Sequence, residues 1–218
     1  MDGSPRQPDE RWRVTLTQVA PDADPGEVAR AGTDLLRRWS EPHRRYHTGQ
    51  HLTEALAALD TIDATEELDP TDRAAAELAL WFHDAVHDSA AADNEIRSAS
   101  LAGHVLTALG VSPRLRVLVP ILVRGTAGHA ALGGTPVGDA VHDADLWILS
   151  APSARFDEYC RQVRAEYAHI ADPAYGAGRR MALEPYLRAE PLYLTRAGAT
   201  WERRAKVNLR REVIRLPR

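Results

Sequence analysis

Two pairs of histidines stand out in the sequence because the members of each pair are four residues apart. One pair is His47 and His51, in "RRYHTGQHL", and the other is His83 and His87, in "WFHDAVHD". Side chains four residues apart project from the same face of a helix. If each pair lies on a helix, each presents two imidazoles in one direction, which is an arrangement that can bind a metal or move protons.

Carboxylates accompany these histidines. Asp84 and Asp88 directly follow the two histidines of the second pair, and Asp145 stands at the start of an apolar stretch in "HDADLWIL". Imidazole nitrogen and carboxylate oxygen together suit Mn²⁺, Fe²⁺, Co²⁺, Ni²⁺ or Zn²⁺, whereas imidazole argues against Mg²⁺ alone. We therefore expect one divalent transition metal ion, whose identity the spacing does not choose, and a second ion is possible.

Nearly every segment around these residues has the pattern of a helix. Over residues 25–39, apolar side chains recur at steps of three and four residues. Thr48, Thr71 and Ser112 are the expected N-caps of later helices, and strand patterns are scarce, with residues 11–19 ambiguous. Helices are expected over residues 25–39, 48–60, 69–88, 93–110, 112–129, 153–170, 181–190 and 198–216, with loops near 61–70, 88–93 and 127–140.

These elements predict an all-α fold with one domain over residues 9–218, preceded by a flexible tail over residues 1–8 that is rich in proline, glycine and charge. A chain of 218 residues can bury a substantial core without disulfides or structural metals. The single cysteine, Cys160, excludes an internal disulfide framework and suits a reducing cytoplasm.

The charge and the distribution of apolar residues limit the class of partner. The net charge of -4 argues against non-specific binding to a nucleic-acid backbone, so no duplex nucleic acid is expected as a partner. No apolar run approaches the roughly 18 residues of a membrane span, and the polar N-terminus lacks the apolar core of a signal peptide. A cytoplasmic protein without a membrane partner is expected, and a homo-oligomer is compatible with these observations.

The order of these motifs resembles the HD-domain superfamily of metal-dependent phosphohydrolases, whose signature is a His, then a His-Asp pair, then a distant Asp. The similarity is closest to one bacterial branch, the predicted metal-dependent HD phosphohydrolases, and it runs from about residue 30 to the C-terminus. The stretches that carry it are "RRYHTGQHL", "FHDAVHD" followed by "NEIRSASLA", "DADLWILS", "EYAHI", "GRRMAL" and "RAKVNLRRE".

The resemblance implies an HD-domain-like helical bundle in which His51, His83, Asp84 and Asp145 bind one divalent ion. The chain departs from the branch at His87, where a tyrosine is usual. Three roles are therefore open for His87: a ligand for a second ion, an acid–base group, or a replacement without functional consequence.

Three further residues are candidates for proton transfer. His47 could orient a water or touch a phosphate, although a hydrogen-bonded, half-buried histidine is the alternative. Asp88 and Glu95 lie around the loop after the His-Asp pair, where a carboxylate could accept a proton from a nucleophilic water. The alternative for Glu95 is a place in the first turn of the next helix, beside its positive dipole end.

Two residues are candidates for binding a phosphate group. The planar fork of Arg44 can hold two phosphate oxygens, although a solvated arginine is the alternative. His129 lies in a glycine-containing stretch that could border the pocket. Arg179 and Lys206 belong to the C-terminal motifs, but ion pairing at the edge of the core explains them equally well.

These residues predict a metal-dependent hydrolase that cleaves a phosphomonoester or phosphoanhydride bond of a small phosphorylated metabolite. The resemblance favours a nucleotide as that substrate, although no residue in the sequence indicates recognition of a nucleobase. One alternative is an HD-type di-iron oxygenase, because His87, His104 and His129 fall between the His-Asp pair and the last Asp. Another is a regulatory protein that binds a nucleotide and hydrolyses nothing.

Overall fold

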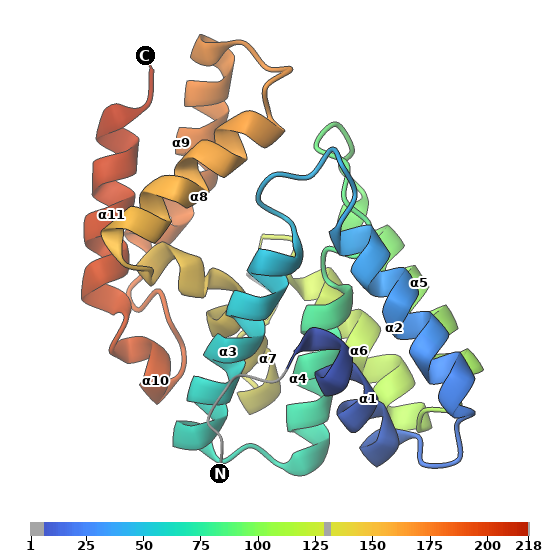
Figure 1. Ribbon diagram of the computed structural model, residues 1–218. Helices are drawn as coiled ribbons and strands as arrows, with labels where there is room; N and C mark the ends of the chain where they lie inside the picture. The colour runs from blue at the N-terminus through green and yellow to red at the C-terminus, as the bar shows by residue number, and fades with distance from the viewer. Residues whose placement is uncertain (1–6, 129–131, 218) are drawn as a thin grey trace.

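All secondary structure in the described chain is helical in the computed structural model, which covers residues 7–128 and 132–217. This confirms the expected all-α fold, and the ambiguous residues 11–19 belong to a helix (Figure 1). The helices are α1 (Pro8–Val19), α2 (Pro25–Trp39), α3 (Gly49–Glu66), α4 (Pro70–Phe82), α5 (Asn94–Ala108), α6 (Pro113–Gly125), α7 (Pro136–Asp145), the 3₁₀ helix η1 (Leu146–Ser150), α8 (Ser153–Glu166), α9 (Asp172–Arg188), α10 (Arg196–Ala199) and α11 (Glu202–Arg215).

A side chain caps the start of some helices, namely α2, α3, α4, α7 and α10. Thr48 caps α3 as expected, because its side chain accepts a hydrogen bond from the Gln50 N–H. The cap of α4 is Asp69 and not Thr71: the Asp69 carboxylate accepts from the Thr71 N–H, and Pro70 then occupies the first helical position. Ser112 does precede α6, but its side chain makes no capping hydrogen bond.

Several expected boundaries were wrong. The loop near residues 61–70 is much shorter, since α3 continues to Glu66 and ends at Glu67 in a left-handed conformation, with φ of 56°. The last part of the expected loop over 127–140 is helical because Pro136 starts α7. The helix expected over 181–190 begins earlier, at Asp172. The tail expected over residues 1–8 falls mostly outside the described residues, and Pro8 already belongs to α1.

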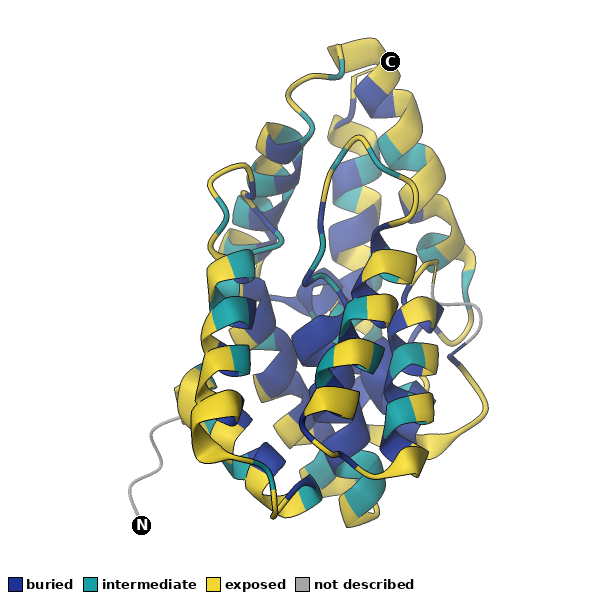
Figure 2. Cartoon of the chain, turned by 90° about the vertical axis from the view of Figure 1, so that its right-hand side faces the viewer, coloured by how far each residue is buried: buried dark blue, intermediate teal, exposed yellow. Residues whose placement is uncertain are grey.

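Helices α1 to α7 form the main body, with a core that includes three fully buried tryptophans (Figure 2). The indole of Trp39 donates a hydrogen bond to the Trp81 carbonyl at 3.1 Å, and the indole of Trp12 donates to the Val28 carbonyl at 2.8 Å. The rings of Trp12 and Trp81 meet edge to face at 5.4 Å. These contacts fix the end of α4, from which the His-Asp pair projects.

Helices α8, α9 and α11 form a second group beside the body (Figure 1). The amide of Asn208 in α11 donates hydrogen bonds to the carbonyls of Leu149 and Ala151, at 2.9 and 3.0 Å. This buried amide ties α11 to η1, the element that directly follows α7. None of the described helices combines the length and the apolar character that crossing a membrane requires.

Candidate metal centre

Four side chains from three separate helix ends converge on one point, and they are the four residues that the resemblance implied as ligands. His51 lies in the first turn of α3, His83 and Asp84 directly follow α4, and Asp145 is the last residue of α7. We call them the ligand cluster. His51 Nε2 lies 3.1 Å from both His83 Nε2 and Asp145 Oδ1. His83 Nε2 lies 3.0 Å from Asp84 Oδ2 and 3.4 Å from Asp145 Oδ1.

The other ring nitrogen of each histidine is already held. His83 Nδ1 lies 2.8 Å from the Leu80 carbonyl, to which it donates, and His51 Nδ1 lies 3.1 Å from the Tyr46 hydroxyl. Histidines that bind metals are usually oriented in this way through the nitrogen that does not bind the ion. Both Nε2 atoms therefore face the carboxylates, with their side chains only 2–3% exposed.

The charge at this point favours a cation. Burial alone would lower the pKa of His83, but the carboxylates of Asp84 and Asp145 raise that pKa well above its ordinary value. Burial likewise opposes the ionised form of Asp84, yet the neighbouring His83 and His47 hold its pKa below its usual range. Nitrogen and carboxylate oxygen atoms within 4.8 Å of one another fit a divalent transition metal ion, and His51, His83 and Asp145 could hold one.

A second group of buried side chains lies next to the ligand cluster. Glu166, at the end of α8, accepts a hydrogen bond from His47 Nδ1 and lies 2.9 Å from His87 Nε2, although the latter pair lacks hydrogen-bond geometry. The rings of His47 and His87 stack at 4.0 Å. We call these three residues the Glu166 cluster.

The carboxylate of Glu166 is saturated with donors. Its second oxygen accepts from the backbone N–H groups of Arg45, Tyr46 and His47 at 2.7, 3.0 and 3.3 Å. Burial opposes its ionised form, but the hydrogen bonds from His47 and the backbone hold its pKa well below the usual range. The sequence contained a signal for this residue, because Glu166 is the glutamate of "EYAHI", but it received no role there.

The two clusters correct the predicted pairing of the histidines. The condition under which His47 and His51 would share one helical face is not met, because α3 begins only at Gly49. The pair of His83 and His87 is also split, since α4 ends at Phe82 and the chain then turns. Each helix end therefore sends one histidine into the ligand cluster and one into the Glu166 cluster.

A cavity of about 370 Å³ contains the ligand cluster and is closed on one side by α8 and α9. We call it the ligand cavity. Its lining residues are Tyr46, His47, His51, His83, Asp84, Glu95, Thr126, Asp145, Leu146, Ile148, Leu149, Tyr159, Val163, Tyr167, Arg179, Ala182, Leu183 and Tyr186.

Arg179, on α9, is the arginine that lines the ligand cavity. One of its terminal nitrogens donates to the Tyr159 hydroxyl at 2.6 Å, and its guanidinium lies over the Tyr159 ring at 5.0 Å. Its Nε is buried without a hydrogen-bond partner, and no described carboxylate pairs with it. Ion pairing at the core edge, considered for Arg179 from the sequence, is therefore wrong. Lys206 does form an ion pair, with Glu202 at 3.5 Å, and it also donates to the carbonyls of Tyr186 and Leu187 near the end of α9.

Arg44 does not line the ligand cavity, so its interpretation as a phosphate clamp is not supported. Its side chain is fully buried, and its guanidinium donates to Glu41 and to the backbone carbonyls of His47, Asp84 and Ala85. With these donors engaged, the guanidinium fastens the segment before α3 to the turn after α4. Arg44 thus positions the ligand cluster by holding the backbone next to it, without lining the cavity.

The remaining candidates divide between the cavity and the surface. Glu95 lines the ligand cavity from the first turn of α5. Asp88 is exposed, does not line the cavity, and its carboxylate accepts from the Ala90 N–H in the loop before α5. His104 bonds the Ser100 carbonyl on the exposed side of α5, and His129 lies outside the described residues.

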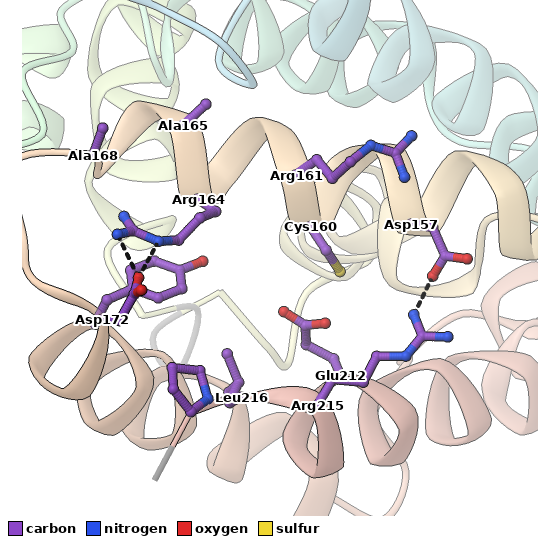
Figure 3. A pocket seen from close by; sticks show the side chains of 12 residues that line it. Asp157, Cys160, Arg161, Arg164, Ala165, Ala168, Asp172, Glu212, Arg215 and Leu216 are labelled. Atoms are coloured by element: carbon purple, nitrogen blue, oxygen red, sulfur yellow. Dashed lines mark hydrogen bonds and ion pairs between the residues drawn. The ribbon is translucent and has the colours of Figure 1, made fainter.

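A cavity of about 800 Å³ lies between α8, α9 and α11, and its side chains offer less reactive chemistry than the ligand cavity (Figure 3). Arg164 pairs with Asp172 at 2.7 Å, and Arg215 pairs with Asp157 at 2.8 Å. Burial and the nearby Glu212 raise the pKa of Cys160 to about 12, so its thiol stays protonated. No histidine lines this cavity.

Comparison with known proteins adds no family assignment: no protein-family model matches the chain, and no curated protein matches it. The relation to the HD-domain superfamily therefore stays a prediction from the sequence motifs. The geometry of the described side chains carries the functional inference.

Proposed function

We propose that this protein is a divalent-metal-dependent phosphohydrolase that cleaves a phosphomonoester or phosphoanhydride bond of a small phosphorylated metabolite, with a nucleotide favoured. One observation carries the proposal: a group of cation ligands and a half-buried arginine without a described carboxylate partner line the same cavity. A cation would balance the carboxylates of the ligand cluster, and an anion would balance the guanidinium of the arginine. A phosphate ester with its metal ion satisfies both requirements.

The ligand cluster would hold the ion through His51, His83, Asp84 and Asp145. When bound, a divalent ion there supplies Lewis acidity, which lowers the pKa of water and offsets the charge of a phosphate group. The protein's own contribution is orientation: the Leu80 carbonyl and the Tyr46 hydroxyl fix the two imidazoles before any ion enters.

Arg179 would bind the phosphate of the substrate. The half-buried guanidinium has no described carboxylate partner, and its planar donors match phosphate oxygens. The contact with Tyr159 holds the guanidinium without neutralising it. Its charge therefore stays available to an anion in the ligand cavity.

His47 is the best-placed group to transfer a proton. Its Nδ1 is held by Glu166, while its Nε2 lies 4.0 Å from Asp84 Oδ2, at the edge of the ligand cluster. A histidine fixed through one nitrogen presents the other in a defined direction, which suits a general base or acid. Glu95 lines the same cavity and is the second candidate.

The proposal is tested by removing and restoring the ion. Protein stripped with a chelator is assayed for release of phosphate or pyrophosphate from a broad panel of nucleotides and sugar phosphates, before and after addition of Mn²⁺, Co²⁺, Ni²⁺ or Zn²⁺. We expect turnover only with the ion, and its loss in Arg179→Met. Absence of turnover across the panel with every ion would overturn the hydrolase; tight nucleotide binding without turnover would identify a regulatory protein instead.

One observation favours a second candidate function. His47, Asp84 and His87 also offer ligand atoms within 4.8 Å of one another, so Asp84 could contact two ions. A di-iron oxygenase would then be possible. Metal analysis after growth with iron decides this: two irons per chain, falling to one in His87→Ala, together with substrate-dependent oxygen uptake, would favour the oxygenase, whereas one ion in both proteins would not.

A further inference from the structure

Two adjacent arginines on α9 contact different parts of the molecule. Arg179 lines the ligand cavity, where one of its terminal nitrogens donates to the Tyr159 hydroxyl. Arg180 instead donates a hydrogen bond at 2.6 Å to the backbone carbonyl of Leu216, in the segment that follows α11 (Figure 3). Successive side chains diverge by about 100° around a helix, so the two guanidinium groups leave α9 on different faces. A contact that fixes α9 through Arg180 therefore also fixes the backbone that carries Arg179.

The same segment touches α9 one turn earlier, at Gly176. A Cβ added to Gly176 would lie 2.3 Å from the Pro217 carbonyl oxygen and 3.1 Å from a carbon of the Pro217 ring. The nearest of these atoms belongs to the backbone, so a larger residue would push α9 and the segment apart. Gly178, two residues further along α9, has no described atom within 4 Å of an added Cβ. We call the contacts of Gly176 and Arg180 with the segment after α11 the α9–α11 junction.

The α9–α11 junction connects α9 to the opposite side of the ligand cavity. The Leu216 N–H donates to the Glu212 carbonyl at 3.1 Å, which keeps the segment aligned with α11. Helix α11 is in turn tied to η1 by the amide of Asn208. The residue directly before η1 is Asp145 of the ligand cluster. One helix is therefore fastened to the element that follows Asp145 and to the helix that carries Arg179.

We propose that Gly176 and Arg180 are positioning residues, which hold α9 at the α9–α11 junction and thereby keep the Arg179 guanidinium in place for a phosphate group beside the ligand cluster. This rests on the proposed function for the role of Arg179. The hydrogen bond and the ring contact of Arg179 are both with Tyr159 on α8, so neither ties the guanidinium to the helices that carry the ligand cluster. Small displacements of a donor weaken its hydrogen bonds steeply, so the anchoring of α9 matters for binding.

A purely structural role for the α9–α11 junction predicts a different result. If the junction only stabilised the fold, substitutions there would lower the free energy of unfolding but leave the phosphate affinity of the folded protein unchanged. If the junction positions Arg179, phosphate affinity falls in a folded protein that still binds its ion, because Gly176 and Arg180 do not line the ligand cavity. Phosphate affinity and metal content, measured on the same samples, therefore separate the two roles.

The test compares two glycines of the same helix. Gly176→Ala and Gly178→Ala bring the same gain in helix propensity, but only the first places its Cβ against the backbone of Pro217. Calorimetry measures the Kd of inorganic phosphate in the presence of Mn²⁺. We expect this Kd to rise about tenfold in Gly176→Ala, the scale of one weakened hydrogen bond to a charged group, and to stay within about twofold in Gly178→Ala. Metal content should be equal in both, and equal phosphate affinities would overturn the proposal.

Two variants of Arg180 test the second contact of the α9–α11 junction and replace Gly176→Ala should that variant not fold. Arg180→Met loses the donor to the Leu216 carbonyl, whereas Arg180→Lys keeps a donor and the positive charge. We expect the Kd of phosphate to rise about fivefold to tenfold in Arg180→Met and by less than about threefold in Arg180→Lys. Circular dichroism confirms that the compared variants are folded. Equal losses in the two variants would overturn the role of Arg180.

A measurement without phosphate distinguishes this proposal from the proposed function. The Nε–H of Arg179 is buried, so its exchange with water, followed by NMR, reports whether the side chain keeps its place. We expect exchange at least about tenfold faster in Gly176→Ala than in Gly178→Ala. If the unmodified protein binds no phosphate, the proposed role of Arg179 fails and this exchange rate alone decides the positioning. If the protein hydrolyses phosphate esters but exchange and phosphate Kd are unchanged in Gly176→Ala and Arg180→Met, the hydrolase stands and the positioning fails.

Discussion

The ligand cluster and the Glu166 cluster are built from the same residue types, side by side, yet the surroundings of their carboxylates differ. In the Glu166 cluster a single carboxylate accepts hydrogen bonds from His47 and from three backbone N–H groups. In the ligand cluster, His51 and His83 turn their Nε2 atoms toward each other and toward two carboxylates, 3.0–3.7 Å away. Histidine and carboxylate together are therefore an incomplete criterion for a metal site.

The difference lies in what the protein itself supplies to each carboxylate. Glu166 is surrounded by donors, so its charge is compensated within the fold. Asp84 and Asp145 face the Nε2 atoms of His51 and His83, whose Nδ1 atoms are engaged elsewhere, so these ligand atoms converge on a point where a cation can bind. This contrast predicts that changes in the ligand cluster act mainly on metal content, whereas loss of the Glu166 carboxylate acts mainly on stability.

The largest expected effect is on metal content. His83→Ala removes one ligand and the orientation given by Leu80, and we expect the bound metal per chain to fall at least about tenfold. Elemental analysis of the purified protein measures this. His104→Ala, on the exposed side of α5, should retain the ion. Undiminished metal in His83→Ala would abolish the distinction between the clusters.

The next effect is on stability. Glu166→Ala leaves three backbone N–H groups and the Nδ1 of His47 without their acceptor, and we expect the free energy of unfolding to fall by about 3 kcal/mol. Urea denaturation in the presence of chelator excludes any contribution from the ion. Glu158, on the same helix with a side chain 43% exposed, is the matched control, and its alanine variant should change stability by less than about 0.5 kcal/mol. Equal losses in the two variants would contradict the assignment.

A smaller stability effect, but a clear binding effect, is expected at Arg179. Its guanidinium has no carboxylate to leave unpaired, so Arg179→Met should cost less than about 1 kcal/mol of stability. Loss of a charged donor should nevertheless weaken binding of inorganic phosphate about 10- to 100-fold. Calorimetry and urea denaturation on the same samples separate the two effects. A large loss of stability with unchanged phosphate affinity would make Arg179 a structural residue.

The smallest effect is a difference in acid sensitivity. The pKa of Glu166 is lower in the folded protein than the value of about 4.3 usual for an unfolded chain. A carboxyl with a lowered pKa stabilises the fold above the unfolded value and loses that contribution as the pH falls. Unfolding measured at pH 7, 5 and 4 should therefore show a smaller decline for Glu166→Gln than for the unmodified protein. A parallel decline would place the acid-sensitive group elsewhere.

The sequence predicted the helical fold and the members of the ligand cluster well, for separate physical reasons. Apolar periodicity and capping residues determine helices locally, as in α2, whose predicted bounds at Pro25 and Trp39 match the structure. The ligands were predicted by their resemblance to an ordered motif, and the structure brings all four together.

What the sequence did not predict depends on long-range packing or on the last residues of helices. The re-pairing of the histidines follows from helix ends at Gly49, two residues after His47, and at Phe82, five residues before His87. Glu166 lies 119 positions from His47, to which it bonds, and Arg179 lines a cavity whose His51, His83 and Asp84 come from distant parts of the sequence. No local pattern reveals such partners.

Through the hydrogen bonds of Asn208 to the backbone around η1, α11 supports the ligand cluster, although it contributes no residue to that cluster. Asp145 is the last residue before η1. The amide that holds η1 belongs to Asn208, 63 positions downstream of Asp145. A polypeptide cut short after α9 would still contain all four residues of the ligand cluster, yet η1, which directly follows Asp145, would have lost the hydrogen bonds of Asn208. If the cluster holds an ion as proposed, we expect it to do so only after α11 has docked during synthesis.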